Sequence, residues 1–204
     1  MPMDGIMLDA ICYELNREIT GGTIDKIQQP ENDTILIGIR NESKNKKLLL
    51  TLGSQPRIHL TSESYQNPQL APSFCMLLRK HLQGAKLSDI EQLGFERAVL
   101  LSFDTRDEMG FDTKCYLVAE LMGKYSNLIF LNEKKRIVSA LKVVDFTTSS
   151  LRQVLPGMLY EMPPKQNKSD PLLATKDSFS ALWHDAPADA RADKFIINNY
   201  LGIS

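Results

Sequence analysis

The sequence predicts an α+β fold, in which a sandwich-like antiparallel β-rich domain is followed by the start of a helical domain. Short apolar or alternating segments recur between turn signals, as is typical of antiparallel strands. No helical pattern separates the later segments, so the crossover connections that a parallel sheet needs are missing. A polar, proline-rich stretch after residue 162 then ends the strand pattern.

The chain is predicted to open with a helix over residues 6–19. Apolar side chains recur there at helical spacing, and Gly21 and Gly22 follow as a stop signal. Asp4 precedes the first turn, where its carboxylate is expected to cap the helix. A second helix is expected over 72–83, because it begins with proline and Gly84 closes it.

Nine strands are predicted from the alternation of apolar residues and from the turns between them. Four of these strands precede the second helix, and five follow it. They are expected at 23–29, 34–40, 47–52, 57–61, 86–92, 97–104, 114–122, 128–131 and 136–144.

The composition changes at 163–171, where polar residues and three prolines replace the alternation. We therefore predict a β-rich domain over residues 1–162, a linker over 163–170 and the beginning of a helical domain over 171–204. The helical patterns at 178–184 and 187–200 are too short to bury much surface alone. The chain is therefore expected to stop inside this second domain.

The overall composition is that of a globular protein. The 204 residues are 43% hydrophobic and 24% charged, which excludes fibrous and wholly disordered classes. No window of 18 apolar residues occurs, and the N-terminus lacks a basic segment followed by an apolar run. The sequence therefore predicts neither a membrane span nor a Sec-type signal, and we expect a cytoplasmic protein without a membrane partner.

No pattern points to a metal, a cofactor or catalysis. Cys12, Cys75 and Cys115 lie far apart in apolar segments and are expected to be buried, reduced thiols. The three histidines show no ligand spacing to them or to one another. Gly123 and Lys124 lack the other residues of a phosphate-binding loop, and no serine stands in a nucleophile elbow. We therefore expect no metal, no cofactor and no enzymatic activity.

Positive charge is unevenly spread, although the formal net charge is only -1. Residues 40–86 carry an excess of six positive charges, which could attract phosphates. Within this window, Arg79, Lys80 and His81 stand near the end of the second helix. There they either satisfy the helix dipole or contact phosphate, and Lys124 is a further candidate phosphate contact.

Six motifs occur in order along the chain. They are MDG with ELN (3–5, 14–16), GTIDKIQQP (22–30), RIHLT (57–61), FCMLLRKHL (74–82), GFER (94–97) and ELMGKYSN (120–127). On these residues the chain resembles the N-terminal domain of the NFACT family over about residues 2–162. The resemblance implies a role in ribosome-associated quality control. The full-length protein would bind large ribosomal subunits obstructed by peptidyl-tRNA and recruit tRNA(Ala) to extend the stalled chain with alanine.

The resemblance also suggests which residues act. In the family an Asp-Arg pair and an acidic residue near the N-terminus are needed for tailing, so Glu96, Arg97 and Asp4 are the candidates for tRNA binding and tailing. Glu96 departs from the pattern, because glutamate carries its carboxylate one methylene farther from the backbone than aspartate does. Asp4 has the capping role described above as well.

The resemblance leaves two alternatives open. The family fold is similar to the N-terminal domain of formamidopyrimidine-DNA glycosylases, which attack through an N-terminal proline followed by a catalytic glutamate. Here Pro2 is followed by Met3, so that acid is missing and no glycosylase activity is expected. The other alternative is a fibronectin-binding surface adhesin of a Gram-positive bacterium, because members of the family are described as binding fibronectin.

Overall fold

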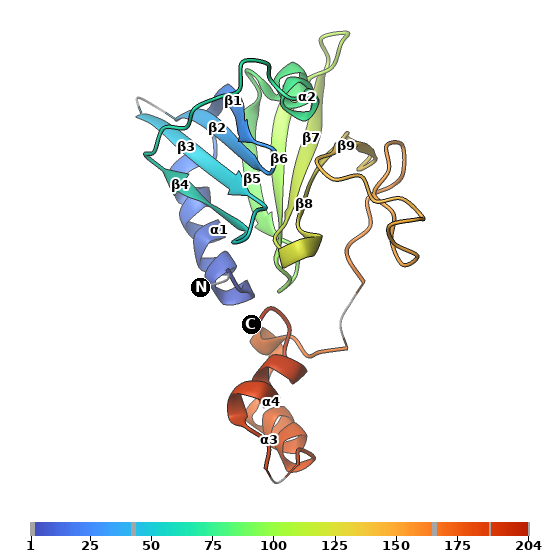
Figure 1. Ribbon diagram of the computed structural model, residues 1–204. Helices are drawn as coiled ribbons and strands as arrows, with labels where there is room; N and C mark the ends of the chain where they lie inside the picture. Colours follow the sequence, from blue (N-terminus) through green and yellow to red (C-terminus); the bar gives the residue numbers. More distant parts are fainter. Residues whose placement is uncertain (1–2, 42–43, 165–166, 188, 204) are drawn as a thin grey trace.

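The computed structural model describes residues 3–41, 44–164, 167–187 and 189–203 (Figure 1). It confirms an α+β fold with nine antiparallel strands across the described residues. The helices and strands are α1 (Gly5–Ile19), β1 (Thr23–Glu31), β2 (Thr34–Asn41), β3 (Lys44–Thr51), β4 (Arg57–Thr61), α2 (Ser73–Leu82), β5 (Lys86–Gln92), β6 (Ala98–Arg106), β7 (Asp112–Glu120), β8 (Asn127–Leu131), β9 (Ile137–Ala140), α3 (Lys176–His184) and α4 (Ala192–Asn199).

The strands form one continuous sheet in the order β4-β3-β2-β1-β5-β6-β7-β8-β9. The two halves of this sheet, β1–β4 and β5–β9, meet at one residue pair, Thr23 with Lys86. Both strands at this junction have an irregular register, β1 between Ile24 and Lys26 and β5 after Leu87. Such irregularities bend and twist strands. The strands thus belong to one sheet that bends at this junction, whereas the two layers of a sandwich would be two separate sheets.

A single hydrophobic cluster unites the two halves of the sheet. Buried side chains of β1–β4 and of β5–β8 belong to it together with one face each of α1 and α2. Ile37, Leu50, Leu101 and Leu117 are fully buried members. Successive side chains of a strand point to opposite faces of the sheet, and in β6–β8 both faces are buried, because Leu100, Val118 and Ile129 belong to a second, smaller cluster. The core is thus shared like that of a sandwich, although the sheet does not break.

The first helix begins at Gly5, one residue before the predicted start, and Asp4 caps it as predicted. The Asp4 carboxylate accepts a hydrogen bond from the backbone amide of Met7 at 2.8 Å, which caps the helix. The predicted thiols are also confirmed: Cys12, Cys75 and Cys115 are free and buried. Burial raises the pKa of the Cys12 and Cys115 thiols to about 12, so both stay protonated at neutral pH.

Several predicted boundaries are wrong. The third strand begins at Lys44 and not at residue 47, because its lysines lie on the exposed and half-buried end of a regular ladder with β2. The last strand stops at Ala140, where the chain leaves the sheet. The last helix begins at Ala192, because a turn with a hydrogen bond from the Ala190 amide to the Pro187 carbonyl precedes it.

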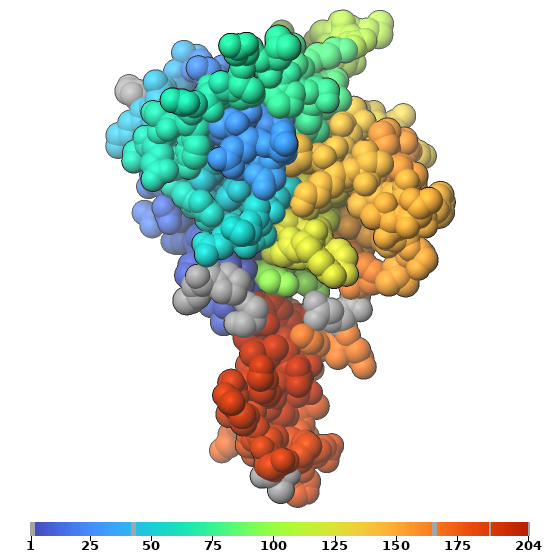
Figure 2. All heavy atoms as spheres, viewed as in Figure 1, coloured from blue at the N-terminus to red at the C-terminus, as the bar shows by residue number. Residues whose placement is uncertain are grey.

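The segment after the sheet ends in a small helical lobe (Figure 2). Aromatic side chains join α3 to α4: Trp183 meets Phe195 edge-on at 4.8 Å between ring centroids, and Phe179 meets Phe195 at 5.5 Å. The predicted division at 162 and 170 stays a prediction, and residues 165 and 166 of the expected linker lie outside the described residues. The lobe contacts the sheet domain where the Gly5 amide donates to the Gly202 carbonyl at 2.5 Å.

Candidate functional site

The structure brings the start of α1 against the loop between β5 and β6. The side-chain amide of Gln92 donates to the Gly5 carbonyl at 3.1 Å and to the Glu96 carbonyl at 3.0 Å. A Cβ atom on Gly5 would lie 3.0 Å from the Phe95 carbonyl oxygen, so glycine permits this close approach. Asp4 directly precedes this contact. The three residues that the family resemblance suggested therefore come from two segments held together at one end of the sheet.

The backbone around Arg97 is fixed on both sides, while its side chain is not. The Arg97 carbonyl accepts from the Leu121 amide at 2.7 Å, and Leu93 closes the loop by donating to Ala98 at 2.9 Å. Gly94 has a φ of 64°, which glycine adopts readily. The side chains of Glu96 and Arg97 are half-buried. Within the part of the chain that the structure describes, neither has a hydrogen-bond or ion-pair partner, so both can engage a ligand.

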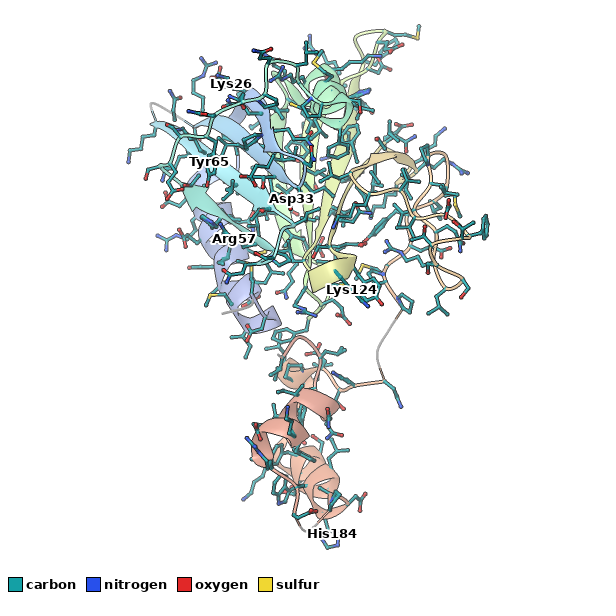
Figure 3. The ribbon with its side chains drawn as sticks, in the orientation of Figure 1. Lys26, Asp33, Arg57, Tyr65, Lys124 and His184 are labelled. Atoms are coloured by element: carbon teal, nitrogen blue, oxygen red, sulfur yellow. The ribbon has the colours of Figure 1, made fainter. Side chains whose placement is uncertain are left out.

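Lys124 lies at the same end of the sheet (Figure 3). It belongs to a short 3-10 helix, Gly123–Tyr125, which follows β7. Its ammonium group lies 4.9 Å from the centre of the Tyr125 ring, and Tyr125 is 71% exposed. A cation beside an exposed aromatic ring can contact a phosphate while the ring stacks on a base.

The other predicted phosphate contacts lie at the opposite end of β6. Thr105, near the end of that strand, donates to the carbonyl of His81 at 3.1 Å. Arg79 donates through Nε to the Ile27 carbonyl at 2.8 Å, and Lys80 pairs with Glu108 at 2.9 Å. The structure therefore does not bring this group together with Arg97.

His81 packs against an apolar surface. Its ring lies 5.3 Å from the ring of Phe130, and burial lowers the pKa of its imidazole, with the charge of Lys80 as a smaller cause. The negative charge of Glu108 raises this pKa, but by less than burial lowers it. The ring is thus favoured in its neutral form, which would be a weak phosphate ligand.

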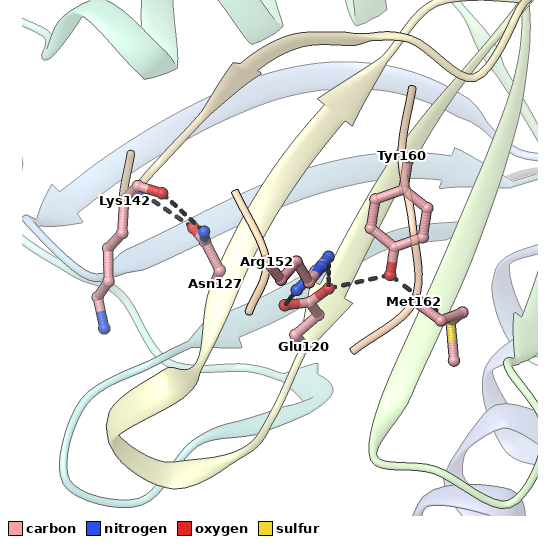
Figure 4. Close-up of polar contacts among 6 residues, drawn as sticks. All are labelled: Glu120, Asn127, Lys142, Arg152, Tyr160 and Met162. Atoms are coloured by element: carbon pink, nitrogen blue, oxygen red, sulfur yellow. Dashed lines mark hydrogen bonds and ion pairs between the residues drawn. The ribbon is translucent and has the colours of Figure 1, made fainter. Parts of the chain in front are cut away.

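A buried polar network beside the site is absent from the sequence predictions (Figure 4). Glu120, 2% exposed, accepts two hydrogen bonds from the Arg152 guanidinium at 2.7 and 3.0 Å. Tyr160 donates its hydroxyl proton to the same carboxylate at 2.9 Å. Burial, and then the charge of Glu120, raise the pKa of Tyr160 well above its usual range. The sequence signal that could have indicated this network is an acidic residue, Glu120, at the end of an apolar strand.

This network fixes the segment that follows β9. A second pair supports it, since the Asn127 side chain donates to the Lys142 carbonyl at 2.7 Å and accepts from the Lys142 amide at 2.9 Å. Glu120 immediately precedes Leu121, the residue that holds the Arg97 carbonyl. The segment is thus anchored beside the end of the sheet that carries Arg97.

The described residues contain neither a membrane-spanning helix nor a metal-binding cluster. No helix among them is long and apolar enough to cross a membrane. In the same ranges no group of three or more His, Cys, Asp or Glu residues could hold a metal ion.

The sequence matches the family described as NFACT N-terminal and middle domains over residues 4–204. It is 39% identical over 206 residues to the Rqc2 homolog RqcH of Bacillus subtilis, which covers 100% of this chain and 36% of that protein. It is 30% identical over 182 residues to the ribosome quality control complex subunit NEMF of Homo sapiens, covering 89% of this chain and 16% of NEMF. The chain thus spans about a third of the bacterial relative.

The fold is also that of a solved structure, the N-terminal domain of the fibronectin-binding protein PavA of Streptococcus pneumoniae. The TM-score is 0.89 at 30% identity, over 99% of this chain and 75% of that one. The fibrinogen-binding protein of Staphylococcus aureus matches with a TM-score of 0.87 and 30% identity, over 100% of this chain and 71% of that chain. On the match over residues 4–204, this chain belongs to the family of NFACT N-terminal and middle domains.

Proposed function

We propose that this chain is the N-terminal part of a ribosome-associated quality control factor. The whole protein would bind large ribosomal subunits that carry an obstructing peptidyl-tRNA, and recruit tRNA(Ala) so that the stalled chain is extended with alanine. It would do so in the cytoplasm, without a cofactor and without catalysis by this domain. The relatives named for ribosome quality control support this proposal.

The observation that carries the tRNA role is the side chain of Arg97, which has no polar partner among the described residues although its backbone is fixed. A guanidinium has five donors in a planar fork, which suits paired acceptors on a phosphate or a base edge. Glu96 and Asp4 would add negative charge at the same place. Lys124 would contact a nearby phosphate, with Tyr125 beside it for stacking.

The test is alanine tailing on stalled large subunits with the full-length protein, paired with co-sedimentation. Arg97→Ala should abolish tailing and leave ribosome binding largely intact, because other domains are expected to hold the ribosome. Arg106→Ala is the matched control, since Arg106 lies at the other end of β6 and pairs with Asp112. Normal tailing by Arg97→Ala would remove this residue from the site.

The fold is further proposed to be similar to the N-terminal domain of formamidopyrimidine-DNA glycosylases without their chemistry. Those enzymes need an acid after the N-terminal proline, and Met3 stands at that position. Pro2 itself lies outside the described residues. Trapping with borohydride on damaged duplex DNA should give no covalent adduct.

Fibronectin binding by a surface adhesin is the second candidate function. The similarity to a streptococcal fibronectin-binding protein supports it. Saturable binding of the full-length protein to immobilised fibronectin, together with detection on intact cells, would favour this role. Tailing activity without either result would favour the ribosomal role alone.

A further inference from the structure

We propose that Gln92 is a positioning residue for Arg97 in tRNA recognition. Its side-chain amide would hold the Glu96–Arg97 peptide against the start of α1, and so aim the Arg97 guanidinium at its ligand. This inference rests on the proposed function of Arg97. Gln92 belongs to none of the six sequence motifs. It stands two residues before GFER (94–97), and only the folded chain brings it to Gly5 as well.

The reason for an amide at this place lies in the sheet. Strand β5 pairs with β1 only at Lys86, so further along its edge β5 faces α1 in place of a strand. Asn16 on α1 satisfies this edge, since its amide donates to the Ile90 carbonyl at 2.5 Å and its oxygen accepts from the Ile90 amide at 3.2 Å. Gln92 continues the same connection, two residues further, toward the start of α1.

The amide nitrogen of Gln92 has two protons, and each has an acceptor. One goes to the Gly5 carbonyl and the other to the Glu96 carbonyl. The Glu96 carbonyl belongs to the planar peptide unit that also contains the Arg97 nitrogen. A hydrogen bond to that oxygen therefore fixes the plane from which the Arg97 side chain departs.

The peptide on the other side of Arg97 is fixed independently. The Arg97 carbonyl accepts from the Leu121 amide at 2.7 Å. With both flanking peptides held, the Cα–Cβ direction of Arg97 is set before any ligand arrives, so binding requires less ordering. Removing the Gln92 donors would free one of these two peptides and leave the other unchanged.

The experiment measures tRNA affinity of the full-length protein, with melting temperature and ribosome co-sedimentation recorded alongside. Gln92→Met is similar in size and cannot donate, and it should weaken tRNA binding by about fivefold or more. Gln92→Glu, which also lacks the donors, is the second variant in case the first folds poorly. Ribosome co-sedimentation should stay at the wild-type level in both variants.

Asn16→Ala is the matched control. It removes the other amide that joins α1 to β5, so it should lower the melting temperature at least as much as Gln92→Met. It should leave tRNA affinity near the wild-type value, because Asn16 does not contact the Glu96–Arg97 loop. An equal loss of affinity in Asn16→Ala would assign the effect to stability and overturn the proposal.

A double variant separates positioning from a direct contact. If Gln92 acts through Arg97, then Gln92→Met should cause no further loss of affinity in the Arg97→Ala background. An additional fivefold loss there would refute this inference. Wild-type affinity in Gln92→Met, with a loss in Arg97→Ala, would refute it while sparing the proposed function. Wild-type affinity in Arg97→Ala would refute both.

Discussion

The two ends of the antiparallel sheet both carry basic side chains, but these side chains differ in what they contact. At the end next to α2, Arg79 and Lys80 have protein acceptors, and His81 packs on an aromatic ring. At the other end, among the described residues, the side chains of Glu96 and Arg97 have no partner although their backbone is fixed. The first group is engaged by other groups of the protein, whereas the second is available for a ligand. Charge in the sequence alone does not separate these cases.

The same contrast holds for the ion pairs. The pair of Arg152 with Glu120 is buried next to the Arg97 end, while the pair of Lys80 with Glu108 is exposed. Arg152→Ala leaves a buried carboxylate without its partner, so it should lower the free energy of unfolding by about 3–5 kcal/mol. Lys80→Ala should leave it near the wild-type value, because exposed pairs contribute little. Urea unfolding of this chain measures both.

A paired replacement sharpens this prediction. Glu120→Leu together with Arg152→Met removes both charges and should recover much of the loss, since apolar groups can replace a buried pair. A small effect of Arg152→Ala would mean that water reaches Glu120 and that the two ends do not differ in this respect.

Much of the fold could be predicted from the sequence, because short apolar or alternating segments between turn signals are typical of strands. The strands over 57–61 and 86–92 occur with the predicted bounds. The pairing of Glu120 with Arg152 could not be predicted, since 32 residues separate them and each alone resembles a surface charge. The same holds for Gln92, which reaches Gly5 across 87 residues.

The candidate site was predictable only in part. Glu96, Arg97 and Asp4 came from a family resemblance and not from any local pattern, and whether they bind tRNA stays a prediction. The group at the end of α2 followed from charge. Its hydrogen bonds depend on β1 and on the β6–β7 hairpin, and its packing depends on Phe130 of β8; the helix sequence specifies none of these.

The salt dependence of RNA binding also compares the two ends of the sheet, with a smaller expected effect. If Lys124 contacts a phosphate, Lys124→Ala should weaken RNA binding modestly and reduce the salt slope of log K by about one. Lys80→Ala should do less, because Lys80 must first leave Glu108. Binding of tRNA at several salt concentrations measures both slopes. Equal reductions would make the α2 end part of the RNA-binding surface.

The smallest expected effect concerns the pH dependence of stability at His81. Burial lowers the pKa of His81 in the folded chain below the ordinary value of 6.5. Between the lowered pKa of the folded chain and the ordinary pKa of the unfolded chain, the unfolded chain binds more protons. The stability that the neutral His81 ring supports is therefore fully present above about pH 6.5 and is lost as the pH falls. His81→Leu should therefore lose less stability than the wild type between about pH 7.5 and about pH 5.5.

His184→Gln is the control for this measurement, because His184 is exposed at the tip of the helical lobe (Figure 3). It should keep the wild-type loss of stability on acidification.

A phosphate bound next to His81 would favour the protonated ring and oppose the loss of stability on acidification. If the α2 end does not bind RNA, added tRNA should leave the His81-dependent change of stability with pH unchanged. If tRNA instead raises the pKa of His81 that this pH dependence reports, His81 contacts a phosphate. Both ends of the sheet would then belong to the RNA-binding surface.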